Sequence, residues 1–398
     1  MPIQKRIYVS LYLCLVSFSL LGAESSKPLT VILKSPTEAI LPYNVELSGT
    51  FNQWQLNGTS KMKWQDIEKH YQFNLPHDGS YTYFNFYKNG DWQNPISTEF
   101  GKPFTCGFIV DPNQESRFIP EFFGWAKESN IIPPRTVVGD LVTVTDFPMT
   151  LLDRTGDIFI YLPDNYRESM KKHYPVVYML DGQNLFSESL SYSYEWRVDE
   201  IVTSMPLDVI IVGIANGPQR WQEYNPWDSV NYMGNSYEGL GEKTIRFILD
   251  ELKPYIDQNY RTLKAAENTA LLGSSLGGLM ALYAGILHGE SFGKVAAFSP
   301  AFSFSTAEAQ ATLNAEQSNL INAVKGLKES NKTKLYFDVG EVEYGSFALI
   351  EELYDSFLNA GYDRDQLRMV KDKLGRHCEL DWSRRLPIAL NWLFPTQR

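Results

Sequence analysis

The chain has 398 residues, of which 43% are hydrophobic and 14% aromatic, and its formal net charge is −11. This composition is too apolar for a disordered chain, and the acidic balance disfavours nucleic acid or an anionic membrane surface as a partner. At roughly 100 to 200 residues per domain, the length indicates two globular domains.

The N-terminus has the pattern of a secretory signal. Lys5 and Arg6 precede an apolar run over residues 7–21, and small residues follow up to Ala23. A basic start, an apolar segment and a small-residue cleavage site are typical of a signal peptide, here residues 1–23. Cleavage near Ala23 removes two cations and no anion, which moves the net charge from −11 to −13. No later apolar stretch is long enough to span a bilayer, so we expect a secreted or periplasmic protein.

Residues 27–118 have the pattern of a small all-β domain. Short alternations of apolar and polar residues are interrupted by Asp78-Gly79 and Asn89-Gly90, which are typical hairpin turns. This spacing predicts a sandwich of short strands. The strands are expected near residues 31–33, 44–47, 71–75 and 81–87. Residues 119–136, which include Gly124 and Pro133-Pro134 and show no periodicity, are predicted to be a linker.

Residues 137–398 alternate between strand and helix patterns. Apolar residues share one helical face over 245–256 and again over 349–358, where Gly361 follows as a C-cap. Short runs of β-branched and apolar residues between the helices are typical of strands covered on both faces. Such strands are expected at Ile158–Leu162, Val176–Leu180, Val209–Ile214, Thr269–Leu272, Val295–Phe298, Leu335–Val339 and Leu367–Val370. The alternation predicts an α/β domain with a mostly parallel central sheet.

One motif in this domain indicates reactive chemistry. An apolar strand pattern runs into Gly273-Ser274-Ser275-Leu276-Gly277, and a helical pattern follows as far as Leu287. A Gly-x-Ser-x-Gly sequence between a strand and a helix forms a sharp turn that lifts the serine hydroxyl above the sheet edge. We predict Ser275 as the nucleophile, because Ser275 and not Ser274 lies midway between the glycines.

A serine nucleophile needs a base, and His377 has the expected position. It follows the last predicted strand and precedes a terminal helix, on a loop that returns to the carboxyl edge of the sheet. The acid that orients the imidazole should lie between Ser275 and His377 in the chain. Asp338, Glu341 and Glu343 compete for this role. Because Asp338 falls inside a strand and Glu343 follows the strand end, we prefer Glu343.

Acyl transfer also develops an oxyanion, which needs two N–H donors in a dry site. We expect one donor from Leu276, which follows the nucleophile at a helix N-terminus. The other is expected from Gly182 and Gln183 in the loop after an earlier strand, where a glycine permits close approach of the backbone. This chemistry requires no metal and no organic cofactor.

The cysteines permit one disulfide. Cys14 lies in the signal segment, so Cys106 and Cys378 are the pair that remains outside the cytoplasm. The two lie in different predicted domains, and Cys378 directly follows His377, where a covalent link needs fortunate geometry. The sequence does not settle the pairing, but these positions favour two unpaired cysteines.

Motifs along residues 137–398 occur together in a characteristic order. They are Ile160–Pro163, Tyr174–Phe186, Arg220–Tyr224, Gly273–Gly278, Phe298–Phe302, Asp338–Glu343, and His377 with Glu379 and Trp382. In this order they resemble the esterase D or enterochelin-esterase-like branch of the α/β-hydrolases, which also includes feruloyl and acetyl-xylan esterases. The resemblance implies an α/β-hydrolase fold in which Ser275 is the nucleophile, Glu343 the acid and His377 the base.

Four further residues of this half are assigned to substrate binding. They are Arg220, Tyr224, Trp196 and Trp382. The chain departs from the resemblance at Arg376-His377-Cys378, where relatives often have a glycine before the histidine and a small or polar residue after it. We therefore expect a narrower mouth and a changed acyl-group preference.

The first domain resembles early-set immunoglobulin-like modules such as those that bind glycogen and starch. The resemblance is carried by Val45–Trp54, Tyr81–Tyr83 and Trp92. Trp54 and Trp92 are candidate glycan contacts, because exposed aromatic faces stack on sugar rings. The alternative is that they pack in the sandwich core or against the second domain, which we favour for Trp54 and leave open for Trp92.

Together these patterns predict an exported serine carboxylesterase that acts on a small-molecule or glycan ester, most of all a feruloyl or acetyl ester of a polysaccharide or oligosaccharide. One alternative is a siderophore trilactone esterase, which calls for a cationic pocket from Arg197, Arg220 and Arg376. Another is a non-catalytic glycan-binding protein with a hydrolase-like scaffold, since fold alone does not settle function.

Overall fold

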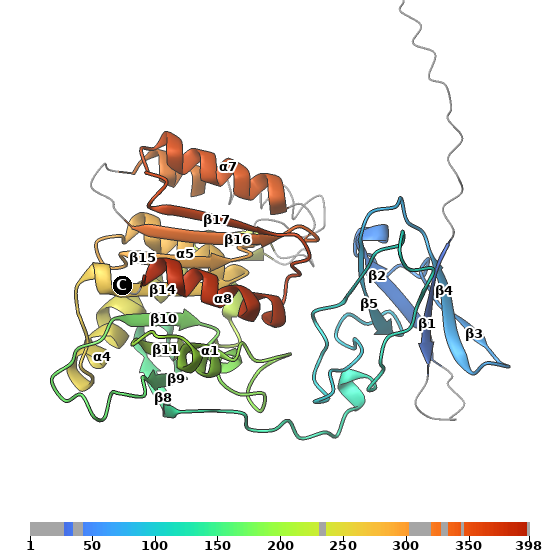
Figure 1. Cartoon of the computed structure of the whole chain (residues 1–398), viewed down its shortest axis with the longest axis horizontal. Coiled ribbons are helices and arrows are strands. Elements are labelled where there is room, and N and C mark those ends of the chain that lie inside the picture. Colours follow the sequence, from blue (N-terminus) through green and yellow to red (C-terminus); the bar gives the residue numbers. More distant parts are fainter. Residues whose placement is uncertain are drawn as a thin grey trace, which may run out of the picture.

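The computed structural model describes residues 28–34, 43–230, 236–301, 320–327, 333–343 and 346–395. Figure 1 shows two parts, a small all-β part and a larger α/β part. The predicted signal segment, residues 1–23, lies outside the described residues. In the portion of the chain that is described, no helix is both long and apolar enough to cross a membrane.

The all-β part consists of two small sheets around one core. Its strands are β1 (Leu29–Lys34), β2 (Val45–Gly49), β3 (Lys63–Gln65), β4 (His70–Leu75), β5 (Thr82–Lys88), β6 (Phe108–Val110) and β7 (Arg117–Phe118). One sheet has the order β3-β4-β1-β7 and the other β2-β5-β6. Val31 of β1 and Phe84 of β5 lie in the same apolar cluster, so both sheets bury one face in a shared core.

Two features of this part differ from the sequence prediction. Asp78-Gly79 connects β4 to β5, which pair with β1 and β2 in different sheets, so this turn does not close a hairpin. Trp125, inside the predicted linker, is buried in the sandwich core, and a short 3-10 helix, Ala126–Glu128, follows it. The first half of the predicted linker therefore packs on the sandwich.

The α/β part is built on one eight-stranded sheet. Its strands are β8 (Asp140–Met149), β9 (Arg154–Leu162), β10 (Val176–Leu180), β11 (Ile210–Ile214), β14 (Thr269–Ser274), β15 (Lys294–Phe298), β16 (Lys334–Gly340) and β17 (Leu367–Asp372). Their order is β17-β16-β15-β14-β10-β11-β9-β8, and β12 (Ser229–Val230) and β13 (Ser236–Tyr237) pair as a separate two-stranded antiparallel sheet. Strands β17 to β11 run parallel, whereas β9 and β8 are antiparallel at one edge.

The seven predicted strands of this part are present, and β8 was missed. β8 is a half-exposed edge strand with an irregularity between Val144 and Phe147 and a proline at position 148, so its apolar alternation is weak. The parallel strands are buried throughout, which is why their apolar runs were recognisable.

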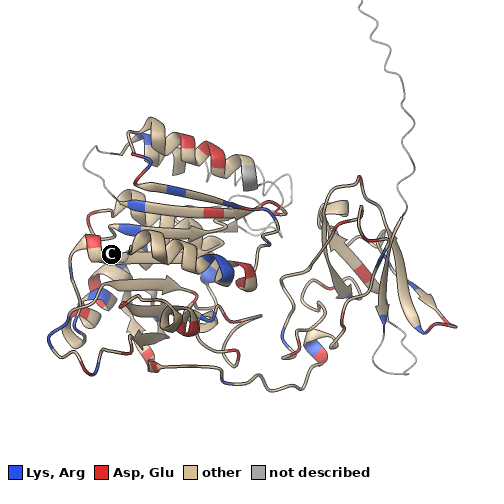
Figure 2. Ribbon diagram, in the orientation of Figure 1, with Lys and Arg blue, Asp and Glu red and all other residues tan. Residues whose placement is uncertain are grey.

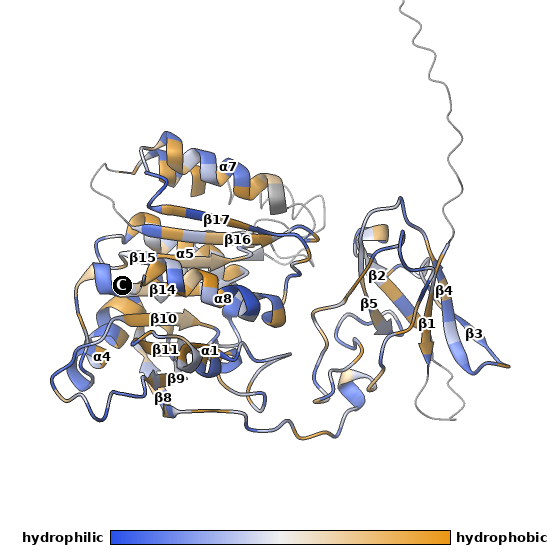
Figure 3. Cartoon of the chain, in the orientation of Figure 1, coloured by the Kyte–Doolittle hydropathy of each residue, from blue (hydrophilic) through white to orange (hydrophobic). Residues whose placement is uncertain are grey.

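Helices cover both faces of the large sheet. Among them are α1 (Val198–Ser204), α2 (Arg220–Glu223), α3 (Gly241–Phe247), α4 (Lys253–Asn259), α5 (Leu276–Leu287), α7 (Ser346–Asn359) and α8 (Glu379–Leu393). Helices α1 and α8 pack on one face, and α3, α4, α5 and α7 on the other (Figure 1). The single helical face predicted over 245–256 is α3 and α4 joined by a π-helical segment, Ile248–Leu252. Figure 3 shows hydrophobic colouring concentrated on the central strands, and Figure 2 shows acidic and basic residues interspersed over both parts.

The two parts are joined by a disulfide between Cys106 and Cys378. The expectation that these cysteines stay unpaired is therefore wrong. The sandwich packs against the start of α8, which brings the two Cα atoms to 5.1 Å, a normal separation for a disulfide. A buried ion pair between Lys102 and Glu188 also connects the two parts.

Candidate active site

Ser275 lies on a sharp turn between β14 and α5. Its backbone has φ 55° and ψ −124°, a left-handed conformation that is costly for a residue with a side chain. Hydrogen bonds hold the turn: the Ser275 amide donates to Phe298 O at 3.0 Å, and the Ala301 amide donates to Ser275 O at 3.0 Å. A strained serine supported in this way between a strand and a helix has the geometry of a nucleophile elbow.

The two flanking glycines have different roles. A Cβ on Gly273 would lie 2.4 Å from the carbonyl oxygen of Gly277, so only glycine permits the helix to start this close to the strand. A Cβ on Gly277 would meet its nearest atom at 3.4 Å, an ordinary contact. The positive φ belongs to Ser275 itself, so the glycines provide room for the turn instead of adopting its strained conformation.

Three side chains from separate elements form one hydrogen-bonded chain. Ser275 Oγ lies 2.9 Å from His377 Nε2, and His377 Nδ1 lies 2.9 Å from Glu343 Oε2. Glu343 follows β16, and His377 lies in the loop between β17 and α8. Because the parallel strands end at the same edge of the sheet, they bring these three distant residues together.

The other two candidate acids lie elsewhere. Glu341 is exposed, and Asp338 is buried inside β16, where its carboxylate lies 3.1 Å from Arg385 Nε. Burial raises the pKa of Asp338 to about 6, and the charge of Arg385 opposes that rise. Of the three carboxylates, Glu343 is the one within hydrogen-bond distance of His377.

The hydroxyl of Ser299 connects the groups that surround Glu343. Ser299 Oγ donates to Glu343 Oε1 at 2.6 Å and accepts hydrogen bonds from Trp382 Nε1 at 3.0 Å and from Arg385 at 2.8 Å. The Gly340 amide also donates to Glu343 Oε1, at 2.8 Å. One carboxylate oxygen of Glu343 is therefore fixed by donors, which leaves the other directed at the imidazole. The sequence prediction missed Ser299 and Arg385, although Ser299 lies within a motif that it identified.

Two residues assigned to substrate binding instead support this cluster. Trp382 is buried, and its ring packs edge-on against the His377 ring at 5.0 Å between centroids. Trp196 is buried between Phe298 and Trp382, at 5.2 and 5.7 Å. Their burial argues against direct substrate contact, because neither indole presents an open face.

The loop assigned to the oxyanion site is fixed by an ion pair. Asp181, in the left-handed region at φ 58°, precedes the short 3-10 helix Gly182–Asn184. Arg220 binds both oxygens of Asp181, at 2.6 and 2.7 Å, and the Asp181 amide donates to the buried Tyr224 hydroxyl at 3.1 Å. Although burial alone would lower the pKa of Arg220, the Asp181 carboxylate raises it above its ordinary value. Arg220 and Tyr224 therefore hold the loop in place.

Gly182 is required where this loop crosses β11. A Cβ on Gly182 would lie 2.6 Å from backbone atoms of Gly213 and Ile214. The close approach that the sequence prediction attributed to Gly182 is thus an approach to the neighbouring strand. Gln183 contributes a further contact, because its side-chain oxygen accepts a hydrogen bond from the Asn216 amide at 3.2 Å.

The two tryptophans proposed for glycan contact differ in exposure. The half-buried Trp54 packs edge-on against Tyr83, 4.7 Å between ring centroids, in line with the packing alternative. Trp92 is 43% exposed and touches Tyr87 on one side. Trp92 therefore presents an aromatic surface to solvent, and Trp54 contributes to the structure of the sandwich.

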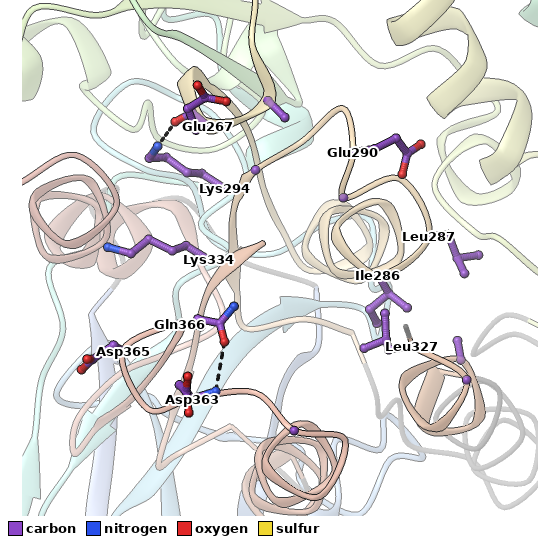
Figure 4. A pocket seen from close by; sticks show the side chains of 16 residues that line it. Glu267, Ile286, Leu287, Glu290, Lys294, Leu327, Lys334, Asp363, Asp365 and Gln366 are labelled. Carbon is purple, nitrogen blue, oxygen red and sulfur yellow. Dashed lines mark hydrogen bonds between the residues drawn. The ribbon is translucent and has the colours of Figure 1, made fainter. Parts of the chain in front are cut away.

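A large pocket lies at the opposite end of the strands, beside their amino ends (Figure 4). It measures about 980 Å³ and is bordered by Lys294 and Lys334 at the amino ends of β15 and β16. Figure 4 shows Lys294 hydrogen-bonded to Glu267 and the Gln366 side chain hydrogen-bonded to Asp363. The labelled side chains do not converge on one point. Ser275 lies at the other end of these strands.

Comparison with known proteins identifies the class. A family model described as "Putative esterase" matches residues 150–357. The chain belongs to this family, and its class is carboxylic ester hydrolase. The uncharacterized protein YbbA of Bacillus subtilis (strain 168) is 23% identical over 253 residues, which cover 60% of this chain and 92% of that protein.

Solved structures with the same fold extend over both parts of the chain. The enterobactin esterase FES from Shigella flexneri aligns with a TM-score of 0.59 at 14% identity and covers 92% of each chain. The ferric enterobactin esterase from Salmonella typhimurium aligns at 0.58 with 16% identity, over 92% of this chain and 93% of that one. At this identity the likeness shows a shared α/β-hydrolase-like fold.

Proposed function

We propose that the protein is a serine carboxylesterase with Ser275, His377 and Glu343 as its triad. The observation that carries the proposal is the chain of two 2.9 Å contacts, from Ser275 Oγ through both nitrogens of His377 to Glu343. Ser275 Oγ attacks the ester carbonyl while His377 Nε2 takes its proton and passes it to the departing alcohol. Water then attacks the acyl-enzyme with His377 again as base, and Glu343 holds the Nδ1–H throughout.

The oxyanion of each tetrahedral intermediate needs donors that are already in place. Leu276 is the first residue of α5, so its amide has no acceptor within the helix and is available to an anion. The second donor is assigned to the Gly182–Gln183 loop, which the Asp181–Arg220 ion pair holds in place.

The direct test is hydrolysis of p-nitrophenyl acetate and butyrate by the protein without residues 1–23, beside Ser275→Ala. We expect loss of roughly 10³-fold or more of kcat in the variant, as for triad serines generally. Ser274→Ala is the matched control and should retain activity. Equal rates in wild type and Ser275→Ala would refute the nucleophile assignment.

We propose that the protein is exported and that its substrate is a feruloyl or acetyl ester of a polysaccharide or oligosaccharide. Two observations support it: the secretory pattern of residues 1–23 and the exposed Trp92 on a sandwich that resembles immunoglobulin-like glycan modules. Release of ferulate or acetate from plant-wall oligosaccharides, with Trp92→Ala as the comparison, tests this. Loss of activity on polymeric but not on small esters would assign glycan binding to the sandwich.

A siderophore trilactone is the second candidate, because enterobactin esterases share the two-part architecture. The arginines named for it are each occupied by a carboxylate: Arg197 by Glu200, Arg220 by Asp181 and Arg376 by Asp381. A catecholate would have to compete with these partners, so the charge distribution favours the glycan ester. A third reading, a glycan-binding scaffold without catalysis, is disfavoured by the hydrogen-bonded triad. Side-by-side assays on a ferric trilactone and a feruloylated oligosaccharide separate the candidates.

A further inference from the structure

His377 is anchored to the sandwich on both sides along the chain. The preceding residue, Arg376, donates from Nη1 to the carbonyl oxygen of Gly107 at 3.0 Å. The following residue, Cys378, is covalently bonded to Cys106. The base of the proposed triad therefore lies between two neighbours that are both attached to the other part of the molecule.

A third contact comes from the same short segment of the sandwich. Thr105 Oγ1 lies 3.3 Å from Glu379 Oε2, so three consecutive residues, 105–107, face residues 376–379. Glu379 is buried, and burial raises its pKa above the ordinary value. The contact is thus an internal one, made in the interface between the two parts.

The anchoring segment is closely packed on the sandwich. Gly107 has φ 58°, and a Cβ there would lie 2.4 Å from the Tyr83 ring and 2.8 Å from the carbonyl oxygen of Phe84. The segment therefore packs tightly on β5 and leads directly into β6. A support of this kind transmits the position of the sandwich to whatever is attached to it.

Contacts within its own part also hold the loop that carries His377, in addition to the contacts with the sandwich. It connects the end of β17 at Asp372 to the start of α8 at Glu379 without strand pairing. Arg376 binds Asp381 through its backbone amide at 2.7 Å and its guanidinium at 2.9 Å, which holds the loop to the first turn of α8. On the other side of His377, the Cys378 carbonyl oxygen accepts hydrogen bonds from the amides of Asp381 and Trp382 at 3.1 and 3.0 Å, and the disulfide joins Cys378 to the sandwich.

We infer that the sandwich positions the proposed catalytic base, through the Cys106–Cys378 disulfide and the Arg376–Gly107 hydrogen bond. Cys106, Cys378 and Arg376 are positioning residues: they keep His377 Nε2 within hydrogen-bond distance of Ser275. The inference rests on the proposed function, in which His377 is the base. It implies that the esterase reaches full activity only in its oxidised form, which an exported protein attains and a cytoplasmic one does not.

The first experiment compares the full chain with the double variant Cys106→Ala/Cys378→Ala. We expect kcat on p-nitrophenyl butyrate to fall by about 10-fold to 100-fold with KM within about threefold, because a displacement on the order of 1 Å costs about 10²-fold. A purely structural disulfide would lower the melting temperature and leave kcat unchanged well below it. Unchanged kcat in a folded double variant overturns the inference.

The matched control is Glu99→Gln. Glu99 is exposed and accepts a hydrogen bond from Tyr194 at 2.8 Å across the same interface. Its kcat should stay at the wild-type level. A fall equal to that of the double variant would assign the effect to general loosening of the interface and overturn the specific role of the disulfide.

Two further measurements test the inference: the first does not depend on activity, and the second does not depend on the double variant. Hydrogen exchange of the peptide containing residues 375–379 should be faster without the disulfide, while exchange in α5 is unchanged. Hydrogen exchange tests whether the disulfide holds the His377 loop even if no ester is hydrolysed. Inactivity towards every ester would refute the proposed function and leave this test of the loop unaffected. Equal exchange in both forms overturns the inference.

Reduction of the wild-type protein is the second measurement. A dithiol passes two electrons and two protons to the disulfide, which yields two cysteine thiols and the oxidised cyclic dithiol. Once mass spectrometry of the alkylated protein shows complete reduction in the folded state, kcat should have fallen as in the double variant and should recover on reoxidation. A fully reduced, folded protein with unchanged kcat contradicts the inference.

Discussion

The two ends of the strands in the large sheet, its amino edge and its carboxyl edge, differ in how their polar side chains are arranged. At the amino edge, the pocket of about 980 Å³ is bordered by charged groups that pair locally or face solvent (Figure 4). At the carboxyl edge, Ser275, His377 and Glu343 share two hydrogen bonds of 2.9 Å and are backed by buried groups. Convergence of donors and acceptors, and not pocket size, is therefore the feature that assigns the proposed chemistry to the carboxyl edge.

Buried charge separates the two edges as well. Arg385 is 1% exposed and lies within 3.1 Å of both Asp338 and Asp372 and 3.7 Å from Glu343. At the amino edge, Lys294 is only partly buried, and burial together with the nearby Lys334 lowers its pKa. Burying charges is costly unless partners compensate them, so the cluster around Arg385 indicates a site where geometry is maintained at the expense of stability.

The largest expected effect is that of Glu343→Gln, which alters the carboxylate bonded to His377 at the carboxyl edge. The amide can still accept from Ser299 and the Gly340 amide, but it presents an NH₂ group to His377 Nδ1 and so favours the wrong imidazole tautomer. We expect kcat to fall by roughly 10³-fold to 10⁴-fold with little change in folding. Steady-state kinetics measure this, and Glu341→Gln, two residues earlier and exposed, is the control. If the two variants were affected alike, the choice of Glu343 over its rivals would fail.

The buried Asp338 should make stability depend on pH in an unusual direction. Burial raises the pKa of Asp338 from 3.8 to about 6, so between these values the folded state binds the proton more tightly than the unfolded state. The contribution of this group to stability is present below about pH 4, declines as pH rises to about 6 and is absent above it, with an amplitude of about 3 kcal/mol.

Asp338→Asn removes that decline. Urea unfolding at pH 4 and pH 7 should show that the variant gains about 2 kcal/mol relative to wild type across this interval, whatever its stability at pH 4. Asp363→Asn, on the exposed amino edge, provides the comparison for loss of a carboxylate. Parallel pH profiles for wild type and Asp338→Asn would mean that Arg385 keeps Asp338 ionised in the folded protein throughout.

A part of this site was predictable from the sequence where the pattern that indicates it lies within a short stretch of the chain or follows from the order of the parallel strands. The turn at Ser275 is local, since a strand, two glycines and a helix follow one another within a few residues. His377 and Glu343 were placed because parallel strands end at one edge. Arg385 was missed because a charged residue in an amphipathic helix is usually solvated, and only carboxylates from β16 and the β17 end make its burial tolerable.

The disulfide shows where such prediction fails. Cys106 and Cys378 are 272 residues apart, and nothing in the local pattern of either indicates the other. Their pairing follows from the way the sandwich packs against α8, which is a tertiary event. The same holds for Trp125: a stretch without periodicity was predicted as linker, yet its aromatic residue fills the sandwich core.

A smaller effect is expected from Arg220, which acts through the loop at Gly182. Arg220→Leu leaves the Asp181 carboxylate without its bidentate partner. This carboxylate lies beside the first turn of α5, since a Cβ on Gly277 would be 3.5 Å from Asp181 Oδ2. We expect kcat to fall by about 10-fold to 100-fold as the loop shifts, with Arg220→Lys intermediate because a lysine keeps the charge but not the fork. Arg197→Leu, which removes an exposed ion pair with Glu200, should leave kcat unchanged. If Arg220→Leu were as active as wild type, the assignment of the Gly182–Gln183 loop to the active site would be refuted.

The smallest effect should come from the amino edge. Lys294 donates to the carbonyl oxygen of Glu267 and lies 5.0 Å from the Phe394 ring centroid, and neither contact reaches the carboxyl edge. Because burial and Lys334 already disfavour its charge, Lys294→Met replaces a costly cation with an apolar chain of similar length. We expect kcat/KM within about twofold of wild type and a change in unfolding free energy of about 0.5 kcal/mol or less, measured by ester hydrolysis and urea unfolding. Sites at opposite ends of a strand are independent when no shared partner links them, so a tenfold loss here would mean that the two edges are coupled through β15 and that the large pocket has a part in the reaction.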